Sequence, residues 1–296
     1  LGIINTPKAG GSVSVSGSCS VEGFSGVEED FSIKLSLDST GKTLTISPLD
    51  GKTVVPQLQE STSSNSLGNV SKVVIEEGLS TLGYHSLAYF SNLVEVSYPT
   101  TLTTIRRYAF DDDYNYKVIT LPTSLNKLCE ECFYGLNPTS LTLPSSVNVI
   151  EPDIMPDAKD TKLNFAGNNT YKVKDNCVYN NSTGELLLVD WYSVNGKTLS
   201  MPEEISSMCL LRGVGATTVD LSKTSVTSVS SFAGNTSIQK VILPKHDITL
   251  GTMCFSDCVN LSTIDNLDYV TCTDWGSLEN TGLTSLDFSS KLTRFA

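Results

Sequence analysis

Residues 96–110 read VSYPTTLTTIRRYAF, and residues 119–133 read ITLPTSLNKLCEECF. In both stretches apolar residues stand at the first and third positions, at the seventh and tenth, and at the last two. Two apolar side chains that are two residues apart lie on one face of a short strand. The stretches therefore predict a repeating unit that contains one short strand followed by further buried positions.

The apolar pair recurs along most of the chain at a nearly constant interval. Its first member is found at Val73, Val96, Ile119, Leu141, Leu163, Leu199, Val219, Val241, Ile264 and Leu286. Seven of the nine steps are 22 or 23 residues long, and the longest is 36 residues. Units of this length with one strand are typical of leucine-rich repeats, which stack their strands in parallel. A β-sandwich would instead repeat its strands every 8–12 residues or so, with hairpin turns between them.

The units resemble the BspA-like leucine-rich repeats of bacterial and some protist surface proteins. Leu102-xx-Ile105-xxx-Ala109-Phe110 follows that family's pattern closely, and Cys254-Phe255 follows it with Cys in place of Ala. The resemblance covers about residues 31–296. It implies a strand-dominated leucine-rich-repeat solenoid of the α/β class, with a parallel β-sheet along one side.

Two hairpins are expected around and within the repeats. Residues 31–69 resemble the family's N-terminal capping hairpin with a linker, and residues 44–46 are expected to form the first strand of the ladder. The 36-residue step resembles a mid-chain hairpin insertion at about 166–197, with its turn at 180–184. The repeats are assigned to residues 70–296, and residues 1–30 to an N-terminal arm or an extra edge strand.

The charge balance limits the class of partner. The chain has 20 basic and 32 acidic residues, a net charge of −12, and no run of Lys or Arg. Nucleic acid is therefore not an expected partner, because binding to a polyanion needs a basic face. No stretch approaches the roughly 18 consecutive apolar residues of a membrane span, so none is expected in the mature chain. The chain begins at Leu1 without Met, which is typical of a processed form.

The motifs that could carry chemistry are weak. Cys129 and Cys132 form a lone CxxC without the second pair that a structural zinc site needs. Most of the eight cysteines are expected to be buried thiols. The three Gly-Lys-Thr triplets lack the further glycine of a phosphate loop. His85 and His246 are the only histidines, and both are expected in loops, facing solvent or hydrogen-bonded.

Residues 111–113, a run of three aspartates, are expected to form a solvated outer loop, because the calcium-loop glycine and glutamate are missing. No catalytic residue, metal or cofactor is therefore assigned, and the chain is not expected to be an enzyme.

The outward positions of the predicted sheet form the candidate ligand-binding face, since strand side chains alternate between the two faces. Its residues are Glu95, Ser97, Thr120, Thr142, Asn164, Ser200, Asp220, Ile242, Asp265 and Asp287. Solenoids use such extended sheets as contact surfaces, although a merely hydrated face is an equally good interpretation. Trp191 and Tyr192 are a candidate glycan platform, with packing of the insertion onto the coil as the alternative.

The resemblance implies a secreted or cell-surface protein that recognises other proteins, for example in adhesion to a host cell, a neighbouring cell or matrix. Anchoring as an outer-membrane lipoprotein is compatible with it. Two alternatives stay open. One is a surface module that captures glycan nutrients, and the other is a hydrolase with a cryptic site.

Overall fold

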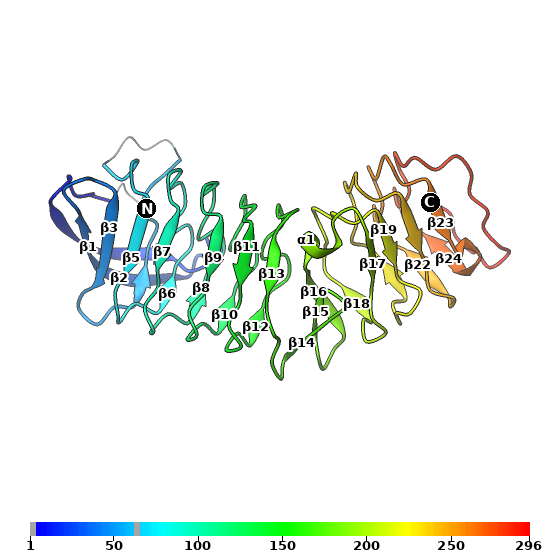
Figure 1. Ribbon diagram of the computed structural model, residues 1–296, viewed down its shortest axis with the longest axis horizontal. Helices are drawn as coiled ribbons and strands as arrows, with labels where there is room; N and C mark the ends of the chain where they lie inside the picture. The colour runs from blue at the N-terminus through cyan, green and yellow to red at the C-terminus, as the bar shows by residue number, and fades with distance from the viewer. Residues whose placement is uncertain (1–3, 62–65) are drawn as a thin grey trace. The chain divides into compact units, whose positions relative to one another are not determined.

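The structure, a computed structural model, describes residues 4–61 and 66–296 (Figure 1). The chain divides into two compact units, unit 1 (residues 1–157) and unit 2 (residues 158–296). The strands of unit 1 are β1 (Ser12–Ser20), β2 (Glu28–Leu37), β3 (Thr43–Pro48), β4 (Val54–Val55), β5 (Lys72–Ile75), β6 (Thr81–Leu82), β7 (Glu95–Ser97), β8 (Thr104–Ile105), β9 (Val118–Thr120), β10 (Lys127–Leu128), β11 (Ser140–Thr142) and β12 (Val149–Ile150). Unit 2 contains β13 (Lys162–Asn164), β14 (Tyr171–Lys174), β15 (Cys177–Asn180), β16 (Glu185–Val189), α1 (Trp191–Val194), β17 (Thr198–Ser200), β18 (Ser207–Met208), β19 (Thr218–Asp220), β20 (Ser228–Val229), β21 (Lys240–Ile242), β22 (Ile248–Leu250), β23 (Thr263–Asp265), the 3-10 helix η1 (Leu267–Tyr269) and β24 (Val270–Thr273).

The predicted parallel ladder is present in both units. In unit 1, β3 pairs in parallel with β5 and β5 with β7, so that Leu44 lies opposite Val73. Strand β9 pairs in the same way with β11. In unit 2, the parallel sheet runs in the order β17, β19, β21, β23. The predicted register is therefore confirmed in these pairings, whereas β7 and β9, which both carry a predicted apolar pair, lie in separate sheets.

A second row of strands, which the repeat pattern did not predict, lies in each turn of the coil. Strands β4, β6, β8, β10 and β12 pair in parallel in unit 1, and β20, β22 and β24 do so in unit 2. These strands contain two to four residues each. They carry the apolar residue at the tenth position of the unit, such as Ile105 and Leu128, both fully buried.

The core is a stack of equivalent side chains from successive turns. Phe110 and Phe133 stack with ring centroids 5.5 Å apart, and Phe232 and Phe255 repeat the arrangement in unit 2 at 5.6 Å. All four are fully buried. Burying a side chain of this size contributes about 1.5–3 kcal/mol relative to leaving it exposed. Each turn gains this energy only against its neighbours, which explains why the same residue types must recur in register.

Antiparallel strands occur at the two expected places. At the start of unit 1, β1 pairs with β2 and β2 with β3. In unit 2, β14 pairs with β15 and β15 with β16, and β16 then rejoins a parallel pairing with β18. The side chain of Asn180 forms the predicted turn by accepting backbone N–H groups of Ser182 and Thr183. Gly184 completes it with a φ of +70°, which favours glycine.

One ladder position was predicted wrongly. Leu286 was expected to begin the last strand, but residues 285–287 form no strand and Leu286 is 36% exposed. Among the described residues, the strand-like pairing beyond β24 is limited to an isolated parallel bridge between Cys272 and Arg294. An apolar pair predicts a strand only where the backbone also finds a partner.

Candidate functional site

The residues of the predicted sheet face fall into two groups because the chain divides into two units. Unit 1 carries Glu95, Ser97, Thr120 and Thr142, and unit 2 carries Asn164, Ser200, Asp220, Ile242, Asp265 and Asp287. All of them are exposed or half-buried, as strand alternation predicts. Asp287 differs from the other nine in that it does not lie in a strand: it belongs to irregular chain beyond β24.

In unit 2 the sheet face contains a groove. Strand register places Asp220 opposite Ile242 and Ile242 opposite Asp265, so these three side chains form one row across β19, β21 and β23. A cavity of about 740 Å³ lies over this end of the sheet, and Ile242, Asp265 and Asp287 all line it. The structure thus brings three of the predicted residues to one hollow.

The groove is acidic. Asp265, Asp268 and Asp287 line it together with one lysine, Lys245. The carboxylate of Asp265 is also 2.7 Å from Nζ of Lys240, and both side chains are about 40% exposed. A pair exposed to this extent contributes little to stability. Its carboxylate therefore remains accessible to a competing cation.

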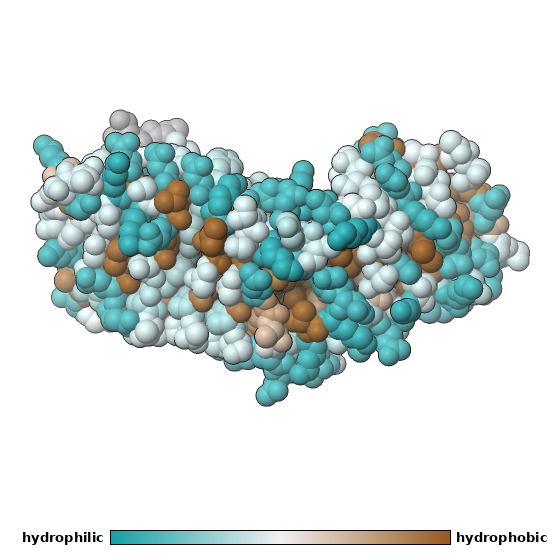
Figure 2. Space-filling model, viewed as in Figure 1, coloured by the Kyte–Doolittle hydropathy of each residue, from teal (hydrophilic) through white to brown (hydrophobic). Residues whose placement is uncertain are grey.

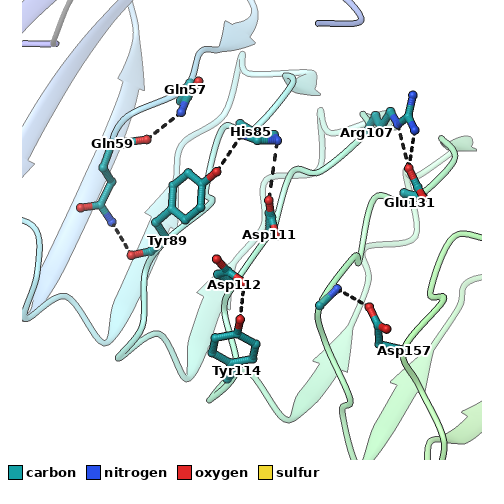
Figure 3. Close-up of polar contacts among 11 residues, drawn as sticks. Gln57, Gln59, His85, Tyr89, Arg107, Asp111, Asp112, Tyr114, Glu131 and Asp157 are labelled. Carbon is teal, nitrogen blue, oxygen red and sulfur yellow. Dashed lines mark hydrogen bonds and ion pairs between the residues drawn. The ribbon is translucent and has the colours of Figure 1, made fainter. Parts of the chain in front are cut away.

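A second polar surface, which the sequence analysis missed, lies in unit 1 (Figure 3). It forms because each turn places one residue in the left-handed region just after its second strand. His85, Tyr108, Glu131 and Asp153 occupy this position with φ between 53° and 57°. These four residues therefore occupy equivalent places in successive turns, and their side chains can meet the side chains of the neighbouring turns.

Aromatic rings meet across these turns. Tyr84 stacks on His85 at 4.3 Å between ring centroids, and Tyr108 makes edge contacts with both Tyr84 and Tyr134. The guanidinium of Arg107 lies 4.7 Å from the centre of the Tyr108 ring and donates from Nε to Glu131 at 2.9 Å. Tyr84, Tyr108 and Tyr134 are 24 and 26 residues apart. That spacing, close to the repeat length, was the signal available in the sequence.

Burial controls the protonation of His85 and Asp111. Burial lowers the pKa of His85 to about 4, and burial together with the nearby charge of Asp112 raises the pKa of Asp111 to about 6. At neutral pH the imidazole is therefore neutral and the carboxylate is ionised. The 3.7 Å contact between His85 Nε2 and Asp111 Oδ2 is consequently a charge–dipole contact and not an ion pair. His85 Nδ1 also lies 3.4 Å from the hydroxyl of Tyr89.

The aspartate run is not the solvated loop that was expected. Asp113 is fully buried, and its Oδ1 accepts the backbone N–H of Phe90 at 2.8 Å. The side chain of Asp111 is only 14% exposed. The cause is the left-handed backbone at Asp112, with a φ of +63°, which turns the following residue inward.

The CxxC cysteines lie in the repeat as packing residues. Cys132 is fully buried, and burial raises the pKa of Cys129 to about 11, so neither thiol is ionised at neutral pH. In the described residues all eight cysteines are thiols and no group of His, Cys, Asp and Glu side chains could hold a metal ion. Gly41, Gly51 and Gly196, which open the Gly-Lys-Thr triplets, have positive φ in turns that lead into β3, β4 and β17.

The aromatic pair at the insertion does not form a two-ring platform. Trp191 is 7% exposed and packs into the core of unit 2, whereas Tyr192 is 60% exposed. The two consecutive residues begin the short helix α1, in which successive side chains point about 100° apart, so Trp191 faces the core while Tyr192 faces solvent. Packing of the insertion onto the coil, the alternative given above, accounts for Trp191.

The second histidine has structural partners. His246 lies with Nε2 3.1 Å from the carbonyl of Thr224 and Nδ1 3.2 Å from that of Asp247. Between residues 4 and 61 and from 66 onward, the helices are too short and too polar to cross a membrane.

Comparison with solved structures gives bacterial leucine-rich-repeat proteins. The pneumococcal vaccine antigen PcpA has a TM-score of 0.56 and 14% identity, over 98% of this chain and 89% of that one. A leucine-rich-repeat protein from Eubacterium ventriosum has a TM-score of 0.48 and 15% identity, over 95% and 92%. A leucine-rich cell surface protein from Faecalibacterium prausnitzii has a TM-score of 0.49 and 15% identity, over 87% and 93%. At 14–15% sequence identity, the similarity to these structures shows a shared fold and does not show a shared function.

Comparison by sequence assigns the family. A search of curated proteins found no match. The family model for BspA-type leucine-rich repeat regions matches residues 59–184 and 194–296, with six copies of the repeat. The matched residues make up most of the chain and include every turn of the parallel ladder from β5 onward. This chain therefore belongs to the BspA-type leucine-rich-repeat family.

Proposed function

We propose that the chain is a binding protein displayed outside a bacterial cell, and that it holds a basic segment of another protein in the groove of unit 2. The single observation that supports the proposal best is the groove itself. Three residues selected for their outward strand positions line one hollow of about 740 Å³, and the hollow is acidic.

The charge of the groove defines the chemistry of the partner. Three carboxylates and one ammonium line it, and the whole chain has a net charge of −12. Complementary charge raises the rate of encounter and selects the partner. A segment that carries Lys or Arg side chains fits both the local and the overall charge.

Asp265 of the groove also shares a strand row with Asp220, which lies outside the groove lining, and the spacing of these two carboxylates narrows the shape of the segment. Neighbouring strands of a sheet lie about 4.8 Å apart, so Asp220 and Asp265, two strands apart, are separated by about 10 Å. A polyproline II helix has three residues per turn and rises about 3.1 Å per residue. Every third side chain therefore points the same way at intervals of about 9 Å. A basic residue at every third position of such a helix matches the row.

Display outside the cell is inferred from the family, whose members resemble bacterial surface proteins. PcpA, which has a similar fold, is named as a vaccine antigen. By analogy, a position on the cell surface is part of our proposal for this chain. The fold of the family is typically non-enzymatic, and the proposed role is binding without catalysis. On the face shown in Figure 2, the surface of each unit is mostly hydrophilic or neutral. Recognition by polar contacts suits such a surface.

Binding of two peptides tests the proposal. The probes are (Lys-Pro-Pro)₄ and a control with Gln in place of Lys, measured by biolayer interferometry at low and high salt. We expect saturable binding of the lysine peptide that weakens with salt. The double variant Asp265→Asn/Asp287→Asn should lose about tenfold in affinity or more, as expected for interface charges. The matched control Asp247→Asn removes an exposed carboxylate elsewhere in unit 2 and should bind normally. Equal affinity of all three proteins, or equal binding of the glutamine peptide, would contradict the proposal.

A further inference from the structure

A cavity in unit 1 lies outside the sheet-face groove. It measures about 600 Å³ and lies between the loop that joins β1 to β2 and the second row of strands, at β8 and β10. Phe24 in the loop forms one wall, and Thr104, Arg106 and Cys129 belong to the opposite wall. A volume of this size lies within the range of small-ligand sites in proteins.

The loop is held in position, so the cavity is a fixed part of the structure. Gly23 has a φ of +78° and approaches the ring of Tyr84 so closely that a Cβ atom there would lie 2.4 Å from it. The backbone N–H of Gly23 donates to the hydroxyl of Ser20 at 2.7 Å. On the opposite side of the cavity, Arg106 forms an ion pair with Glu29 at the start of β2.

The aromatic wall is open. Phe24 is 80% exposed, although its ring meets the ring of Tyr84 edge-on at 6.4 Å between centroids. The ring is at the same time part of the lining of the cavity, so a ligand held there would contact it. The ring offers a flat apolar face on which the C–H groups of a ligand can pack.

The charges around the cavity are balanced. Arg106, Arg107 and Lys127 line it with three positive charges. Glu22, Glu130 and Glu151 line it with three negative charges. Contacts among neighbours hold several of these groups in place. Lys127 Nζ lies 3.0 Å from Glu151, and the backbone N–H of Glu130 donates to Glu151 at 2.8 Å.

Balanced charge favours a neutral polar ligand. A charged ligand of either sign would meet as many like charges as opposite charges in the lining, so a net charge on the ligand gains no net attraction there. A hydroxyl group can donate to a carboxylate and accept from a guanidinium group at the same time. We propose that this cavity is a binding site for a neutral oligosaccharide, with Phe24 as the stacking platform. This site and its ligand are independent of the peptide groove in unit 2.

Isothermal titration calorimetry with six probes tests the proposal. Four are neutral: cellotetraose, maltotetraose, laminaritetraose and chitotetraose in its N-acetylated form. Two are charged: tetragalacturonate and tetralysine. We expect at least one neutral tetrasaccharide to bind, with an affinity that changes little between roughly 0.05 and 0.5 M salt because no net charge is paired.

Variants identify the site. Phe24→Ala should weaken sugar binding by about tenfold or more, as expected for removal of a central aromatic contact. Glu130→Gln should also weaken sugar binding, because it removes the charge and replaces one of the two accepting oxygens by an N–H donor. Tyr192→Ala, which removes an exposed ring in unit 2, and Asp265→Asn/Asp287→Asn should leave sugar binding unchanged. Thermal melts control for folding, and the exposure of Phe24 predicts a melt close to that of the parent.

Three results would overturn the proposal: no neutral probe binds, a charged probe binds in preference to all neutral ones, or Phe24→Ala binds sugar as well as the parent. Because the peptide assay reports on unit 2, loss of one activity without the other separates the two sites.

Discussion

Replacing Asp113 by asparagine should stabilise unit 1. The Oδ1 atom of Asp113 accepts the N–H of Phe90, but Oδ2 is buried without a hydrogen-bond partner in the described residues. Burial, the largest cause, raises the pKa of Asp113 well above its ordinary value. The buried site thus favours the protonated acid, which carries a donor that the carboxylate lacks.

In unit 2, an asparagine occupies the position equivalent to Asp113. Asn235 is equally buried, three residues after a core phenylalanine, and its Oδ1 accepts the N–H of Val214 at 2.8 Å. Its Nδ2 donates to the carbonyls of Leu211 and Phe232 at 2.8 and 2.9 Å. The backbone N–H of Asp113 bonds to Phe110 just as that of Asn235 bonds to Phe232. By this equivalence the carbonyls of Leu87 and Phe110 would accept from an asparagine at 113.

The magnitude follows from the missing hydrogen bonds. A buried polar group without a partner costs about 1–3 kcal/mol, and each new neutral hydrogen bond contributes about 1 kcal/mol net. We expect Asp113→Asn to raise the free energy of unfolding of unit 1 by about 2–3 kcal/mol at pH 7. In a protein region of this size each kcal/mol shifts the melting temperature by about 2–4 °C.

The pH dependence has a definite sign. Because the folded-state pKa of Asp113 is raised, the parent is most stable below the unfolded pKa of about 3.9, and it loses that stability as pH rises through the folded value. The advantage of the asparagine variant should therefore grow from pH 4 to pH 7. Urea denaturation followed by far-ultraviolet circular dichroism at both pH values measures it. The reciprocal change Asn235→Asp should destabilise unit 2 at neutral pH. An asparagine variant that is less stable than the parent, or equally improved at pH 4 and pH 7, would refute the assignment of a protonated acid.

Four further predictions concern unit 1. Relative to the parent, His85→Asn should gain up to about 3 kcal/mol in unfolding free energy as pH falls from 7 to 4, because the pKa of His85 is lowered to about 4 in the folded state and only the parent loses stability by resisting protonation there. Asp111→Asn should lose a similar amount relative to the parent over the same range, because the pKa of Asp111 is raised to about 6 in the folded state and only the parent gains stability when that carboxylate is protonated. Denaturant titrations at each pH measure both variants, and curves parallel to that of the parent would contradict the two predictions. Ile119→Asp should unfold its turn of the coil, because Ile119 is fully buried and an aspartate there would be a buried charge without a partner. Thr120→Asp lies on the exposed side of the same strand and should melt within about 1 °C of the parent. Equal losses of melting temperature in the two variants would contradict the register. Gly23→Ala should displace the β1–β2 loop from Tyr84 and expose it to limited proteolysis followed by mass spectrometry, and an unchanged cleavage rate would show that the close contact does not hold the loop.

The inward half of the fold could be predicted because it is periodic. Leu199, Val219, Val241 and Ile264 lie in one row because each turn must bury the same aliphatic pair against the next. The second row of strands could not be predicted in this way. Its members, such as Lys127–Leu128, are often two residues long, and alternation cannot be recognised over two residues.

The turn positions were hidden for a different reason. Whether the side chain of Asp113 points to solvent or to the core depends on the φ angle of Asp112. The run of three aspartates in the sequence does not reveal that angle, so the burial of Asp113 could not be predicted. The contacts of Tyr108 with Tyr84 and Tyr134 likewise require the register of three turns. Such features arise from tertiary structure and become visible only when the coil is built.

The coil therefore separates two kinds of position with different freedom. Inward positions accept few side chains, since a change there leaves a cavity or a strained contact in a close-packed stack. Outward positions on the sheet face and in the turns carry side chains of any chemistry at little cost in stability. The acidic row of Asp220 and Asp265 and the charge-balanced cavity beside Phe24 consist of outward positions of one scaffold. Their charges differ because the scaffold does not constrain them, and so each surface is expected to have its own ligand.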